Sequence, residues 1–108
     1  GYHDMYHTAK DWSIDKDDFL KQLGETLKVG GKLLIVDHSA VDGSGTKHSQ
    51  KLHRIDAEYV KKELAGKGYK LIKQSSVLSN LEDDRMGSPF SKEIRRKTDR
   101  FVLLFEKK

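Results

Sequence analysis

Histidine and aspartate stand together at two places in the chain. His3-Asp4 lies at the start of the sequence, and Asp37-His38 ends a run of four aliphatic residues, Leu33 to Val36. The first residues are dense in functional residue types. Ligands in open α/β sheets bind beyond the carboxyl ends of the strands, so a strand that ends in Asp37-His38 is where chemistry is expected. The alternative is that Asp37 caps the following turn and His38 is solvated, and the pattern leaves both interpretations open.

His53 and Arg54 end a polar stretch that follows the aliphatic run. Glycine and serine dominate residues 39–54, which predicts a long loop or a short irregular helix. Long loops in compact domains are more often functional than not. We expect this one to bring His53 and Arg54 close to Asp37-His38, with ordinary loop polarity as the alternative.

The apolar pattern predicts a first helix and a strand that would hold Asp37 in place. Asp15 is a suitable N-cap, and apolar residues at helical spacing follow it. Gly30-Gly31 then end the helix and turn the chain into strand 32–37. An unbroken apolar run indicates that this strand is buried on both faces. The expected core stripe of the helix is Phe19, Leu20, Leu23 and Leu27.

The second half of the chain repeats the pattern of a capped helix followed by a strand. Asp56 predicts the N-cap of a helix at 55–65, and a strand is expected at 69–78. The last strand, 100–106, is apolar on both faces and should be central in the sheet. The residues between, 79–98, carry two charge runs and read as a solvated face, with binding of an anionic substrate as the lesser alternative.

Composition limits the class of protein. The chain of 108 residues is expected to form a single domain, 1–108, and residues 2–12 to form a loop ending at Trp12. A net charge of +4, from 21 basic and 17 acidic residues, is too mild for a nucleic-acid binder. Without cysteine, disulfides and thiolate chemistry are excluded. No apolar stretch approaches the ~20 residues that span a bilayer, so no membrane partner is expected.

These patterns together resemble a known family. Residues 27–37 read Leu-Lys-Val-Gly-Gly-Lys-Leu-Leu-Ile-Val-Asp, similar to the segment before and through the fifth strand of class I S-adenosylmethionine-dependent methyltransferases. Tyr2-His3-Asp4 resembles the loop after that family's fourth strand, and the later helix and two strands resemble its C-terminal end. Residues 53–56 with 97–101 resemble a little-characterised group of predicted methyltransferases within it.

The resemblance implies an α/β fold with a partial Rossmann-like sheet. Its three strands would form the C-terminal portion of a methyltransferase, with the last strand antiparallel and central and with two main helices. The missing parts are the glycine-rich cofactor turn and the acidic residue that holds the ribose. The resemblance therefore implies a chain that carries the acceptor side, is inactive alone and binds no S-adenosylmethionine, although the full-length family uses it. The native N-terminus is expected to lie upstream, with a cytoplasmic location only by default.

The resemblance also implies site roles. His3 would be the general base or orient the acceptor, Asp4 would orient His3 or bind substrate, and Tyr2 would lie beside the cofactor. A frayed N-terminus is the alternative for these three. A small-molecule acceptor would be lined by Asp37, His38, His53 and Arg54.

Two further alternatives concern metals and partners. Asp37-His38 with Asp4 could hold magnesium, and His3, His38 and His53 have the ligand type for zinc, but neither has a spacing signature, so no metal is predicted. The edge of strand 32–37 would be left unpaired, which predicts a homodimer through that edge. The alternative to an enzyme is a small non-catalytic α/β module that self-associates or binds a partner through the open edge.

Overall fold

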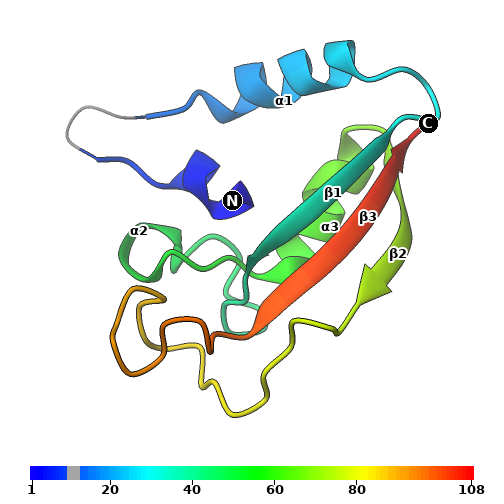
Figure 1. Ribbon diagram of the computed structural model, residues 1–108. Coiled ribbons are helices and arrows are strands. Elements are labelled where there is room, and N and C mark those ends of the chain that lie inside the picture. The colour runs from blue at the N-terminus through cyan, green and yellow to red at the C-terminus, as the bar shows by residue number, and fades with distance from the viewer. Residues whose placement is uncertain (10–12) are drawn as a thin grey trace.

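The computed structural model describes residues 1–9 and 13–108 and contains both helices and strands (Figure 1). Trp12, the expected end of the first loop, lies outside the described residues. The α/β class is confirmed, and each expected strand and main helix is present with slightly different ends. The elements are η1 (Tyr2–Tyr6, a 3-10 helix), α1 (Lys16–Thr26), β1 (Lys32–His38), α2 (Ser49–Leu52), α3 (Ala57–Gly66), β2 (Tyr69–Ser75) and β3 (Arg100–Lys107).

The three strands form one sheet in the order β1-β3-β2. β3 runs antiparallel to both neighbours, with Ile35 opposite Leu103 in one ladder and Leu71 opposite Phe105 in the other. This arrangement confirms the expected central, antiparallel last strand. It also leaves β1 at one edge of the sheet, where its outer backbone groups have no strand partner among the described residues.

The two faces of the sheet differ in exposure. One face is packed against α3, which lies behind the sheet in Figure 1 and buries Val60 and Leu64. On the opposite face Leu34 is 60% exposed and Val36 is 37% exposed. The expectation that strand 32–37 is buried on both faces is therefore wrong. The core residues on the covered face of the strands are Ile35, Tyr69, Phe101, Leu103 and Phe105.

Both main helices begin at the expected capping residue. The Asp15 side chain accepts a hydrogen bond from the Asp18 backbone N–H at 3.1 Å, and Asp56 accepts one from Glu58 at 3.1 Å. These contacts satisfy backbone donors that the first helical turn leaves free. The expected stripe of α1 is confirmed at Leu20, which is buried, but it is wrong at Phe19, which is 46% exposed.

The chain start is ordered rather than frayed. Residues 2–6 form η1 instead of the expected loop, and they bury Tyr2, His3 and Met5. η1 lies beside β1 and α2, so it covers the carboxyl end of the β1 strand. Residues 39–54 form the expected loop with one short helix, α2. No helix of the described chain is long and apolar enough to cross a membrane.

Candidate functional site

A buried aspartate–histidine pair lies at the carboxyl end of β1. Asp37 Oδ1 is 2.8 Å from Nδ1 of His3, and Asp37 Oδ2 accepts the backbone N–H of His3 at 2.6 Å. The two residues are 34 positions apart in sequence and are 3% and 6% exposed. Two contacts from one carboxylate fix both the backbone and the ring of His3. The expected neighbourhood of His3 and Asp37 thus exists in the structure.

Asp4 lies on the other side of the same imidazole. Its Oδ1 is 3.3 Å from Nε2 of His3, and its Oδ2 accepts a hydrogen bond from the chain's terminal ammonium at 2.5 Å. Asp4 thus lies within contact distance of the ring that it was expected to orient.

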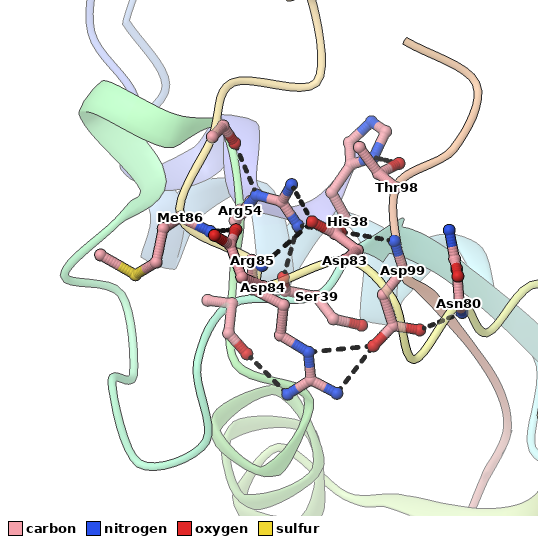
Figure 2. A network of polar contacts seen from close by, with 12 residues as sticks. His38, Ser39, Arg54, Asn80, Asp83, Asp84, Arg85, Met86, Thr98 and Asp99 are labelled. Atoms are coloured by element: carbon pink, nitrogen blue, oxygen red, sulfur yellow. Dashed lines mark hydrogen bonds and ion pairs between the residues drawn. The ribbon is translucent and has the colours of Figure 1, made fainter. Parts of the chain in front are cut away.

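His38 faces a different partner. Its Nδ1 lies 2.8 Å from Oγ1 of Thr98, which is buried, and its ring centroid lies 6.4 Å from that of His3 (Figure 2). Burial lowers the pKa of His38 below its ordinary value, against the opposing effect of the Asp37 carboxylate. His38 is therefore a neutral imidazole near pH 7, with one ring nitrogen committed to Thr98.

His53 completes a cluster of imidazole rings. Its centroid lies 5.5 Å from His3, 4.5 Å from His7 and 5.0 Å from Phe90, which belongs to the segment 79–98. Burial and the neighbouring imidazoles lower the pKa of His53. The expectation that the polar loop carries His53 towards the end of β1 is thus met by the geometry. His7, which was not expected to belong to the site, lies in the same cluster.

Arg54 does not line an open pocket. It is fully buried, and its guanidinium donates to Asp83 Oδ2 at 2.8 Å and Asp83 Oδ1 at 3.2 Å. It also donates to the backbone carbonyls of Gly87 and Ser39. The contacts with Asp83 and Gly87 tie the segment 79–98 to the rest of the fold, and the side chain is fully buried, so a contact of Arg54 with the acceptor stays a prediction.

A second arginine–aspartate pair extends this network (Figure 2). Arg85 donates to Asp99 Oδ2 from Nε at 2.9 Å and from Nη2 at 2.7 Å, and Asp83 accepts the backbone N–H groups of Asp99 and Arg85. Burial would raise the pKa of Asp83, but Arg54 and these backbone donors hold it below its ordinary value. The expectation of a solvated face over 79–98 is wrong at Asp83, whose side chain is 2% exposed.

Tyr2 is built into a contact with α3. It is buried, and its hydroxyl donates to Oε1 of Glu63 at 2.5 Å, a carboxylate that also accepts from Tyr6 at 2.6 Å. Burial and the Glu63 charge raise the pKa of Tyr2. A cofactor contact by Tyr2 stays a prediction, and its polar group is already engaged by the protein.

The residues around Tyr2 do not fit S-adenosylmethionine. A cavity of about 220 Å³ lies between η1, α1 and β1, and its walls are mostly apolar, with Met5, Leu20 and Ile35 among them. A carboxylate, an ammonium and a ribose need several hydrogen-bonding partners, and this wall offers few, with Asp4 and the already engaged Tyr2 among them. Within residues 1–9 and 13–108, no group of three histidines or carboxylates is arranged to hold a metal, so neither the zinc nor the magnesium alternative has a ligand set there.

Several residues of this region were missed by the sequence patterns. Thr98 and Asp99 precede β3 directly, and Phe90 lies in a stretch without helix or strand. Thr98 and Asp99 fall within residues 97–101, which carried part of the resemblance but were given no role, and the signal at Phe90 is a polar segment that is long for a plain connection. No protein family, curated protein or solved structure matches the chain.

Proposed function

We propose that the chain is the acceptor-side portion of a class I S-adenosylmethionine-dependent methyltransferase, with His3 as the general base. The observation that carries this proposal is the buried His3–Asp37 pair at the carboxyl end of β1. In open α/β sheets, ligands bind beyond the carboxyl ends of the strands. The order β1-β3-β2, with β3 antiparallel, also agrees with the family's C-terminal end.

The chemistry proposed for this pair is proton transfer from the acceptor. In this proposal Asp37 accepts the Nδ1–H of His3, Nε2 accepts the proton, and the Asp4 carboxylate stabilises the imidazolium that results. The proton of the acceptor's hydroxyl or amine passes to Nε2, and the acceptor heteroatom keeps its electron pair as the nucleophile. Asp4, 3.3 Å from Nε2, borders the position where the acceptor would lie.

In this proposal the methyl donor is bound by a part of the protein upstream of Tyr2. Two observations support this placement of the donor site: this sequence has no glycine-rich turn of the kind that binds the cofactor, and the cavity beside Tyr2 has a mostly apolar wall. The chain by itself is therefore expected to bind neither S-adenosylmethionine nor S-adenosylhomocysteine.

Calorimetric titration of S-adenosylmethionine and S-adenosylhomocysteine into the purified chain tests whether the methyl donor is bound outside this portion of the protein. No heat of binding is expected, and micromolar binding would overturn the inactive-portion proposal. The base is tested in the protein extended upstream of Tyr2, where His3→Gln should lower methyl transfer at least tenfold. His48→Gln, which removes an imidazole outside the ring cluster, is the matched control and should keep the rate. Equal rates for both variants would remove His3 from the mechanism.

A non-catalytic, self-associating module is the second candidate. It is favoured by the open β1 edge and by the exposure of Leu34 and Val36 on the same strand. It predicts a homodimer in light scattering that Leu34→Lys converts to a monomer. Ile72→Lys, at a position 40% exposed on the other edge strand, should leave the dimer intact. A monomeric wild-type chain would contradict this candidate.

A further inference from the structure

A pocket of about 280 Å³ opens beside His38. Its walls come from the end of β1, from the segment 79–98 and from the first residue of β3. The charged and polar groups among them are Arg95, Arg96, Arg100, His38 and Thr98, and Phe90 contributes an aromatic ring. This pocket is separate from the His3–Asp37 pair, and it shares His38 and Phe90 with the surroundings of the imidazole cluster.

The positive charge of the pocket is not neutralised by the protein. Arg95, Arg96 and Arg100 form no ion pair within the described chain, whereas Arg54 and Arg85 are both paired. The buried carboxylates adjacent in sequence to the lining residues are already engaged, Asp37 by His3 and Asp99 by Arg85. Three arginines without an ion pair in the described chain therefore line one cavity.

The floor of the pocket offers a fixed polar group. Thr98 is buried and occupies Nδ1 of His38, so the ring cannot turn without losing a hydrogen bond of 2.8 Å. Nε2 is then the ring nitrogen left for a ligand, and Figure 2 shows it on the side of the ring that points away from Arg54 and Asp83. The fixed imidazole nitrogen of His38 thus adds a directional hydrogen-bonding group to the positive charge of the arginines.

We propose that this pocket binds the phosphate group of a small molecule. Planar guanidinium groups match the oxygens of a phosphate in paired hydrogen bonds, and a dianion balances more of the three charges than a carboxylate would. The volume lies just below the ~300–1,000 Å³ of pockets that enclose a whole drug-sized ligand, so it suits a head group. The remainder of the molecule would extend past Phe90, whose ring meets His53 edge-on.

The position of the pocket also points to the role of the ligand. His38 and Phe90 border both the pocket and the imidazole cluster, so a molecule anchored by its phosphate reaches towards His3. This makes the methyl acceptor a phosphate-bearing small molecule. That assignment rests on the proposed function, whereas phosphate binding itself does not.

Nuclear magnetic resonance titration with inorganic phosphate tests the site without any methyl donor. Saturable shifts are expected at the His38 ring and Thr98 amide, with acetate binding more weakly. Arg95→Gln/Arg96→Gln should weaken phosphate binding roughly tenfold or more, because charge-assisted hydrogen bonds are lost. Lys92→Gln/Lys97→Gln removes the same charge from exposed positions of the same segment that do not line the pocket, and should preserve most of the affinity.

The outcomes separate this inference from the proposed function. Equal losses in the two double variants would show general charge attraction and overturn the pocket. Acetate binding as tightly as phosphate would overturn the assignment to a dianion. Phosphate binding that is lost only with Arg95 and Arg96 supports the pocket even if the extended protein transfers no methyl group, and in that case the acceptor role alone is withdrawn.

Discussion

Two groups of arginines near the end of β1 differ in whether an aspartate neutralises their charge. Arg54 and Arg85, the paired arginines, each donate to at least one aspartate and to at least one backbone carbonyl. Arg95, Arg96 and Arg100, the open arginines, line a pocket and have no carboxylate partner in the described residues. The same side chain thus stabilises the fold in one group and leaves its charge for a ligand in the other. Burial together with a partner, and not residue type, decides which role an arginine takes.

The largest effect is expected from breaking a buried pair. Asp83→Asn removes the charge that compensates Arg54, and should lower the free energy of unfolding by about 3–5 kcal/mol. Urea unfolding followed by circular dichroism measures this change. Glu82→Gln, one position earlier and exposed, should change it by less than about 0.5 kcal/mol. A similar, small effect for both variants would show that the Arg54–Asp83 pair contributes little.

Lowering the pH should weaken the contribution of the Arg54–Asp83 pair to stability. The pKa of Asp83 is lowered in the folded state, so the unfolded chain takes up the proton at higher pH, and the pair contributes stability that is present above the ordinary pKa of about 4. This contribution is lost as pH falls from about 4 through the folded pKa. Urea midpoints measured across this range should fall more steeply for the wild type than for Asp83→Asn. Parallel curves would contradict a lowered pKa for Asp83.

The smallest effect is expected from the open arginines. Arg95 and Arg96 are exposed and have no ion pair among the residues that the structure describes, so Arg95→Gln/Arg96→Gln should leave the free energy of unfolding within about 0.5 kcal/mol of the wild type. Thermal and urea unfolding both check this. A loss above about 1 kcal/mol would show that these side chains serve the fold and would blur the distinction between the two groups.

Local signals were sufficient for some features. Asp15 and Asp56 cap their helices as expected because an N-cap acts within one turn of its own position. The double-sided apolar pattern of Arg100–Lys107 correctly indicated a central strand. The same reasoning failed for Leu34 and Val36, because an apolar run reports which residues suit burial and not what is present to cover them.

The candidate site was only partly visible in the sequence. His3, Asp4, Asp37, His38 and His53 were named from residue type and position, and the structure brings them together at the end of β1. The structure does not place Arg54 among them as an accessible group. Its partner Asp83 is 29 residues away and lies in a charge run that looks solvated, so no local pattern could reveal the pair.

The sequence by itself determined the α/β class, the helix starts and the residues whose chemistry suits proton transfer, because these depend on side-chain type and short-range spacing. The tertiary structure alone decided which charges are neutralised. Folding brings Asp83 to Arg54 and Asp99 to Arg85, and it leaves Arg95, Arg96 and Arg100 around a cavity. Ion pairing depends on distances between residues that are remote in sequence, so only the folded chain can separate a structural charge from one that is free to bind a ligand.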